Sequence, residues 1–219
     1  MNNLINELQV SAERDDVLTV LRKTKRLASK LGREDIAEWL RAEQTGYSDD
    51  QAVPDYRQIN ARLAYNTNGY IPAGFGQLMS GVVDVPSSGI SGPIPLIDSI
   101  STIINMIESV KAGNGIYFPV VEGTKIAGLV RSLYRVNPMV EHQISFLLHL
   151  NESQIKAIPE QIKDKVLDWA CALEAAGVTG DGLTFSAKEK EIAHAITFNL
   201  NNCNVEQLNN LGNNFRGNQ

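Results

Sequence analysis

The chain has 219 residues, of which 43% are hydrophobic and 21% are charged, and this is the ordinary balance of a globular protein. A chain of this length buries roughly 70% of the surface that its unfolded form exposes, so it needs no metal or disulfide to fold. The formal net charge of −5 and the pI of about 5.3 argue against bulk attraction to nucleic acid or to an anionic membrane.

The two cysteines, Cys171 and Cys203, are too far apart for a metal-binding or redox C-x-x-C motif. We interpret them as free thiols, with Cys171 buried in a helix, and this favours a reducing compartment. No segment reaches the roughly 20 apolar residues that cross a bilayer, and the N-terminus lacks the pattern of a signal peptide. We therefore expect a soluble cytoplasmic protein without membrane insertion.

Helical periodicity dominates the first quarter of the sequence. Apolar residues at helical spacing predict helices over residues 3–12, 17–31 and 33–43. Asp15 or Asp16 can cap the second helix, and Gly32 and Gly46 suit the ends of the second and third.

The period then changes to the alternation typical of strands. We predict strands near residues 57–65, 78–85, 115–121 and 143–150, forming a small, mainly antiparallel sheet. Between the first strand and the next helix lies a long connection rich in Gly, Ser and Pro.

Further helices are predicted from Asp98 to about Val110, at 126–134, at 153–175 and behind Ser186. Gly113 suits the end of the first, Pro159 is placed near the first turn of the third, and Ser186 with Glu189 forms a capping box for the last. The fold class is thus α+β and mostly helical, with an N-terminal helical bundle and a long late helix packed on a small sheet. Five core residues should join the N-terminal helices to the late one: Leu21, Trp39, Leu40, Trp169 and Leu173.

The domain organisation follows from composition. Residues 1–198 form one globular domain, and residues 199–219 are an asparagine-rich tail that is either disordered or used for oligomerisation.

Four separated motifs give the sequence a family resemblance. They are LINELQ near the N-terminus, LRKTKRLASKLGREDIAEWLRAEQTGY followed by VPDYR, KDKVLDWACALEAAGV, and GDGLTFSAKEKEIA. In this order and spacing they resemble the AbiTii domain family of bacterial abortive-infection proteins. The resemblance implies a role in defence against phage, together with a partner protein, and implies no catalytic residues.

A basic stripe is the candidate ligand-binding feature. Its members, at i, i+4, i+8 and i+11 along the second helix, are Arg22, Arg26, Lys30 and Arg33. Guanidinium and ammonium groups in such a row can bind phosphates. The alternative is a solvated surface neutralised by Glu34, Asp35 and Glu38.

No motif of a known active site is present, and we expect no catalytic residue, no metal and no cofactor. Glu191 and His194 form a single E-x-x-H pair, whereas a di-iron bundle needs two. Asp164 and Asp168, one helical turn apart, are better explained as part of a charge-mixed surface.

Three hypotheses for function follow. The first is a non-enzymatic binding and assembly module of an abortive-infection system, which forms homo-oligomers and responds to a trigger or to a second protein. The second is a sensor of a nucleotide or short oligonucleotide that binds through the basic stripe. The third is a nuclease- or hydrolase-type toxin using Asp164, Asp168, Glu191 and His194. We favour the first, without enzymatic activity.

Overall fold

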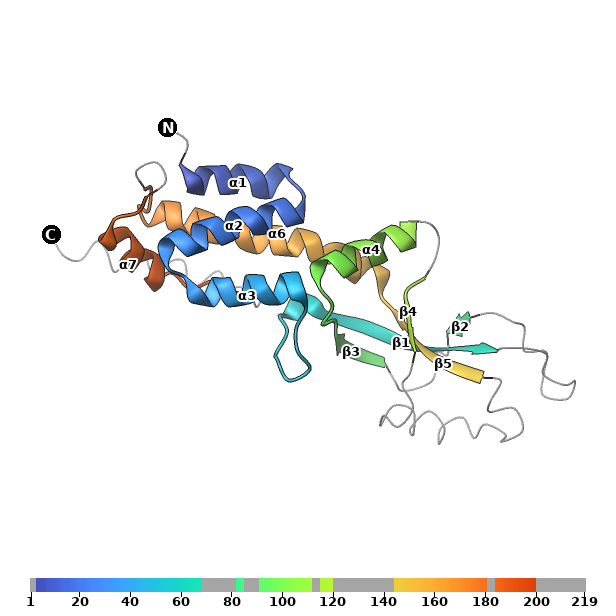
Figure 1. The fold of residues 1–219 in the computed structure, drawn as a ribbon. Coiled ribbons are helices and arrows are strands. Elements are labelled where there is room, and N and C mark those ends of the chain that lie inside the picture. The colour runs from blue at the N-terminus through green and yellow to red at the C-terminus, as the bar shows by residue number, and fades with distance from the viewer. Residues whose placement is uncertain are drawn as a thin grey trace, which may run out of the picture. The chain divides into compact units, whose positions relative to one another are not determined.

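The computed structural model describes residues 3–67, 82–84, 91–111, 115–119, 144–180 and 184–199. The chain divides into two compact units: unit 1 is Met1–Arg41 with Glu160–Gln219, and unit 2 is Ala42–Pro159. Helices outweigh a small antiparallel sheet, so the α+β class is confirmed (Figure 1). The predicted tail lies outside the described residues, apart from Asn199.

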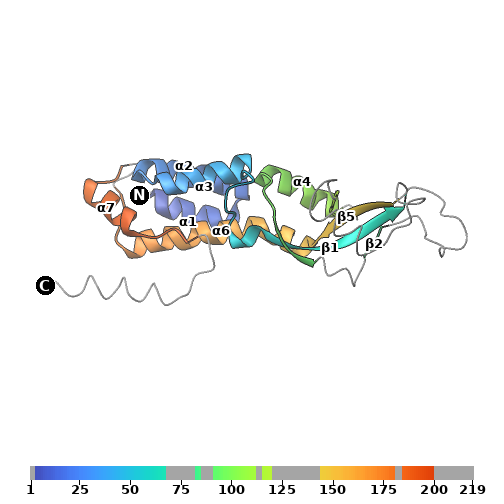
Figure 2. The same ribbon diagram turned by 90° about the horizontal axis from the view of Figure 1, so that it is seen from below.

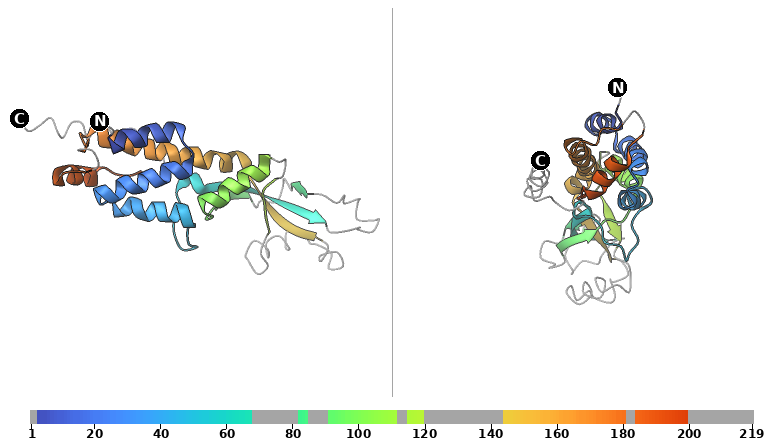
Figure 3. Two further views of the ribbon diagram at one scale, coloured as in Figure 1. Left: turned by 45° about the horizontal axis from the view of Figure 1, so that its top comes forward. Right: turned by 90° about the vertical axis from the view of Figure 1, so that its left-hand side faces the viewer.

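Unit 1 is a bundle of helices (Figures 1 and 3). Its members are α1 (Leu4–Arg14), α2 (Val17–Leu31), the first part of α3 (Glu34–Thr45), the part of α6 (Glu152–Ala175) from Glu160 onward, and α7 (Ala187–Ala195). The helices predicted in this part of the sequence are all present, with ends shifted by one or two residues.

Local sequence fixes where α2 begins and ends. The side chain of Asp16 accepts a hydrogen bond from the backbone N–H of Thr19, at 3.0 Å, and so caps the first turn. The same carboxylate accepts from the Thr19 hydroxyl, and this bond holds the pKa of Asp16 below its ordinary value. Gly32 ends the helix in the left-handed conformation, with φ of 76°, which a side chain would disfavour.

The core of unit 1 contains the five residues that the sequence predicts, each at most 4% exposed. Phe198, beyond α7, contacts both tryptophans of this core. Its ring centroid lies 4.8 Å from that of Trp39 and 5.9 Å from that of Trp169, the second contact being edge-to-face. The segment after α7 is therefore anchored to the bundle by an aromatic cluster.

Unit 2 is built on a five-stranded antiparallel sheet (Figure 2). The strands are β1 (Gln58–Thr67), β2 (Val82–Asp84), β3 (Ser91–Pro95), β4 (Tyr117–Pro119) and β5 (Ile144–Leu150). β1 lies at the centre and pairs with β5 from Ala61 opposite Leu150 to Thr67 opposite Ile144. On its other edge β1 pairs with β3 through its first half and with β2 near its end. Helix α4 (Ile100–Lys111) follows β3.

The sheet contains one strand that the sequence analysis did not predict. The four predicted strands overlap β1, β2, β4 and β5, whereas β3 falls in the stretch interpreted as a connection. Its sequence, SGPIP, has the glycine and prolines of a turn. Pairing with β1 overrides this weak local propensity, and Pro93 and Pro95 are tolerated because, among the described strands, β3 pairs with β1 only. The helix predicted at 126–134 and the stop at Gly113 lie outside the described residues.

Two local predictions were wrong. Pro159 lies seven residues after the start of α6 at Glu152, inside the helix rather than near its first turn. Cys171 is exposed rather than buried, since it lies on the outer side of α6, 3.8 Å from the side-chain nitrogen of Gln9. Partial desolvation nevertheless raises the pKa of the Cys171 thiol.

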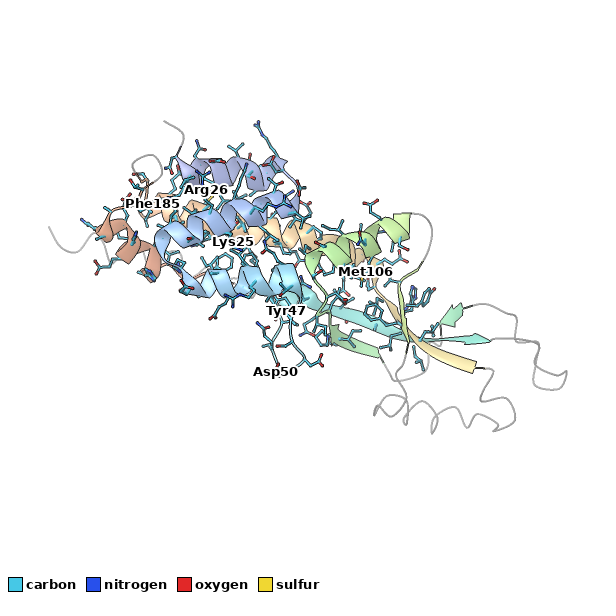
Figure 4. All side chains as sticks on the ribbon, viewed as in Figure 1. Lys25, Arg26, Tyr47, Asp50, Met106 and Phe185 are labelled. Carbon is cyan, nitrogen blue, oxygen red and sulfur yellow. The ribbon has the colours of Figure 1, made fainter. Side chains whose placement is uncertain are left out.

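A fully buried ion pair holds the core of unit 2 together. The guanidinium of Arg57 donates through Nε and Nη2 to the two carboxylate oxygens of Glu43, and both side chains are 0% exposed. The hydroxyls of Tyr47 and Tyr56 each donate to Glu43 Oε1 at 2.7 Å. Figure 4 labels Tyr47, whose ring also lies 5.0 Å from the guanidinium carbon of Arg57.

The remaining donor of Arg57 ties this pair to the chain ahead of α4. Nη1 donates to the backbone oxygens of Leu96, at 3.1 Å, and Asp98, at 2.6 Å. Burial and the neighbouring charge of Glu43 raise the pKa of the Tyr47 hydroxyl well above its ordinary value, so Tyr47 stays a proton donor. Every group in the network is thus paired, as buried charge requires.

Within the described residues, no helix is long and apolar enough to cross a membrane.

Candidate ligand-binding site

Three members of the basic stripe lie together on the exposed side of α2. Arg22, Arg26 and Lys30 are all exposed, and the apolar residues of the helix face the opposite way. None of the three forms an ion pair with a residue in the described ranges. Lys23, on a neighbouring side of the helix, pairs instead with Asp15, at 2.9 Å, and with Glu7. The neutralising partners proposed from the sequence do not reach these three side chains.

Arg33, the fourth member, lies apart from the other three. Its side chain is only 4% exposed, and its Nε and Nη2 donate to the two oxygens of Asp35 at 2.8 and 2.6 Å. This pairing lowers the pKa of Asp35. Nη1 donates to the backbone oxygens of Ala193, at 2.5 Å, and Ile196, at 2.8 Å. Arg33 thus binds the end of α7.

A hollow of about 460 Å³ opens beside the exposed cations of α2. We call it the basic hollow; its lining residues are Arg26, Ser29, Lys30, Thr184, Phe185 and Lys190. Figure 4 labels Arg26 on α2 and Phe185 in the segment before α7. Three of the six are cations, from two helices, and the others are two hydroxyls and a phenyl ring. Such a lining offers positive charge and hydrogen-bond donors to an anion.

The helix that contributes Lys190 is fixed at both ends. At its start, Ser186 and Glu189 form the predicted capping box, in which each side chain bonds the other residue's backbone N–H. The Glu189 carboxylate also accepts from the N–H groups of Thr179 and Gly180. These bonds, led by the one from Ser186, lower the pKa of Glu189 to about 2. At its other end, Arg33 donates to the backbone carbonyls of Ala193 and Ile196. The helix that carries Lys190 is therefore held in place at both ends.

A second hollow, of about 320 Å³, belongs to unit 2. Its lining residues are Asn60, Arg62, His149, Leu150, Asn151, Glu152 and Ser153. His149 stacks on Tyr117 with ring centroids 4.7 Å apart, and Asn151 caps α6 by accepting from the N–H of Ser153. Its lining contains the carboxylate of Glu152 as well as the guanidinium of Arg62, so this second hollow is less suited to an anion than the basic hollow.

The candidate catalytic residues remain on exposed helix surfaces. Asp164 and Asp168 lie one turn apart on α6, and Glu191 and His194 lie on α7. In the part of the chain that the structure describes, no three His, Cys, Asp or Glu side chains form a group that could hold a metal ion.

Sequence reasoning missed half of the basic hollow. Thr184, Phe185 and Lys190 are more than 150 positions away from α2, and no local pattern marks them. The capping box was recognised and predicts where α7 starts, but not which side of it meets α2. The contact between α2 and α7 is a tertiary contact between segments far apart in the sequence, so local patterns do not predict it.

The structure also explains part of the family signature. The motif segments AEQTGY and VPDYR contain Glu43, Tyr47, Tyr56 and Arg57, which are the four members of the buried network. These four motif residues therefore form a buried polar network in unit 2 rather than a surface site.

Fold and site together define a mostly helical α+β protein with a cationic hollow on its helical unit. The chain belongs to the AbiTii family, whose model matches residues 3–198. Membership of this family indicates an abortive-infection defence protein. Comparisons with curated proteins and with solved structures found no match.

Proposed function

We propose that this protein is a non-enzymatic binding module of an abortive-infection system, and that it responds to a phosphate-bearing ligand, a nucleotide or short oligonucleotide, bound on unit 1. One observation carries the proposal. Arg26, Lys30 and Lys190 line one hollow, and none of them has an ionic partner among the described residues. Cations gathered without counter-charge repel one another, and a bound anion relieves this repulsion.

The chemical groups of the hollow favour binding over turnover. Guanidinium, ammonium and hydroxyl groups donate hydrogen bonds to phosphate oxygens and compensate their charge. In this proposal the ligand-bound protein then assembles, with further copies of itself or with a second protein of the defence system. The family supports this second step, because abortive infection couples a trigger to a response.

Calorimetry and light scattering test both steps. Wild-type protein is titrated with adenosine triphosphate and with a thymidylate decamer, and is compared with a variant carrying Arg26→Glu and Lys30→Glu. We expect wild type to bind at least one of these anions and the double variant to bind neither, because the variant turns two cations into carboxylates. The bound anion should be recovered chemically unchanged, and light scattering should show a larger particle when it is present.

Equal binding by wild type and the double variant would remove the hollow from the proposal. A strict monomer at all concentrations, with and without ligand, would contradict assembly into homo-oligomers. Cleavage of either probe would favour the hydrolase hypothesis instead.

A further inference from the structure

Residues of two helices surround the basic hollow, and this arrangement narrows the kind of anion that fits it. A ligand bound by α2 alone would follow the stripe along the helix axis. In an α-helix, positions i and i+4 are separated by about 6 Å along the axis, so such a ligand would have to be extended. Lys190 instead comes from α7 and lines the same hollow as Arg26 and Lys30.

The stripe is also shorter than its sequence suggests. Arg33 is buried and bonded to Asp35 and to the end of α7, so the exposed row ends at Lys30. Arg22 is exposed but does not line the hollow. Of the three exposed cations in the row, only Arg26 and Lys30 line the hollow, where Lys190 of α7 joins them.

Among the residues that the structure describes, the hollow also offers no open stacking surface, on which the binding of single-stranded nucleic acid depends. Bases of a strand stack on exposed aromatic rings. The one aromatic residue of the hollow, Phe185, is only 9% exposed, and its ring is held near the backbone of Gly180. Phe185 thus lines the hollow with a ring that is almost fully buried.

We propose that the ligand of the basic hollow is a compact polyphosphate, such as the triphosphate chain of a nucleotide, gripped from two sides by Arg26 and Lys30 of α2 and by Lys190 of α7. This inference rests on the proposed function and narrows it. A triphosphate places several negative charges within a short span, which matches three cations around one hollow. An oligonucleotide spreads the same charge along an extended backbone.

Binding of three probes to single-site variants of the full chain tests the inference. The probes are inorganic triphosphate, adenosine triphosphate and a thymidylate decamer, at one fixed ionic strength. Lys190→Ala should weaken binding of both triphosphates at least about tenfold, as loss of a charge-assisted contact does. Two control variants, Arg22→Ala on α2 and Lys188→Ala on α7, remove an exposed cation that does not line the hollow, and should each change affinity less than about threefold.

The outcomes separate this inference from the proposed function. Suppose the decamer binds more tightly than triphosphate and Arg22→Ala weakens it as much as Lys190→Ala does. The ligand is then an extended strand lying along α2, so the inference fails while the proposed function stands. If none of the three probes binds wild-type protein, the proposed function fails and takes the inference with it. Circular dichroism of each variant should match that of wild type, and this control checks that the exposed substitutions leave the fold intact.

Discussion

Glu43 and Arg57 form an ion pair in which neither side chain is exposed to solvent. Two tyrosine hydroxyls donate hydrogen bonds to the carboxylate, and the guanidinium donates to two backbone carbonyls. Removing two charges from water is expensive, and the pair is tolerated because both carboxylate oxygens and all three guanidinium nitrogens have hydrogen-bond partners. Stability therefore depends on keeping the network whole.

Breaking this pair from one side should strongly destabilise the protein. Arg57→Met leaves the Glu43 carboxylate buried without its counter-charge, so we expect a loss of about 3–5 kcal/mol in the free energy of unfolding. Urea denaturation followed by circular dichroism measures it. Adding Glu43→Leu should recover part of the loss, and recovery stays incomplete because Tyr47 and Tyr56 then lack their acceptor.

A surface pair provides the control for that experiment. Lys156 pairs with Glu152 at 3.8 Å, and the Lys156 side chain is 45% exposed. Lys156→Met should therefore lower the free energy of unfolding by less than about 1 kcal/mol. Equal effects of Arg57→Met and Lys156→Met would show that the buried network has no special role.

Arg33 should act on stability through the end of α7. Arg33→Lys keeps the charge but replaces a fork of donors by a single ammonium group, which cannot serve Asp35 and two carbonyls together. We expect a loss of about 1–3 kcal/mol and faster amide hydrogen exchange over residues 194–199. Exposed Arg22→Lys is the matched control, and unchanged exchange in the Arg33 variant would contradict the assignment.

Two glycines in the turn after α6 allow a paired test of the wall of the hollow. Gly177 and Gly180 both have positive φ, 78° and 67°, so alanine is strained at either position. A Cβ at Gly177 meets nothing within 4 Å, whereas one at Gly180 would lie 2.9 Å from Phe185 Cε1 and 3.0 Å from the Thr184 oxygen.

Gly180→Ala should therefore lower the free energy of unfolding more than Gly177→Ala does. We expect about 1 kcal/mol for Gly177→Ala and about 2–4 kcal/mol for Gly180→Ala, because the second adds a clash to the strain. Urea midpoints compare the two. Only Gly180→Ala should also weaken triphosphate binding, since Thr184 and Phe185 line the basic hollow. Equal losses of unfolding free energy for both variants would mean that Thr184 and Phe185 shift without cost to make room for the added Cβ.

The capping box should make stability depend on acid pH in a defined direction. The pKa of Glu189 is lowered from its ordinary 4.5 to about 2 by backbone and hydroxyl donors, so folding favours the charged form. That contribution is complete above about pH 4.5 and is lost as the pH falls through about 2. The stability gap between wild type and Glu189→Gln should therefore shrink between pH 5 and pH 2.

Urea midpoints at pH 6, 4 and 3 measure this gap. Glu191→Gln removes the same charge from the same helix outside the capping box, and so separates the effect of the box from that of net charge. A gap between wild type and Glu189→Gln that is constant with pH would contradict the role of the charged carboxylate.

How far the sequence predicts this structure depends on the range of the interactions. The helices of unit 1 follow from local signals, such as Asp16 at the start of α2 and Gly32 at its end. β3 escaped prediction because its pairing with β1 is a tertiary contact that overrides turn-like residues. The local period of apolar residues does not determine which distant strand a segment pairs with, or in which register.

The same distinction applies to the candidate site. Arg22, Arg26 and Lys30 are exposed along α2, as their spacing predicts, because helical periodicity is local. Arg33 has the same charge but lies just beyond the helix end, where the chain turns and buries it. Lys190 joins the hollow only because α7 meets α2, and no pattern near Lys190 indicates that contact.

The aromatic cluster around Phe198 gives the protein a built-in optical label. The chain has only two tryptophans, Trp39 and Trp169, and both belong to unit 1 and contact Phe198. Tryptophan emission during denaturation therefore follows unit 1 alone, whereas far-ultraviolet circular dichroism follows the backbone of both units. Coincident midpoints from the two signals would mean that the units unfold as one cooperative block, and separated midpoints would mean that each melts on its own.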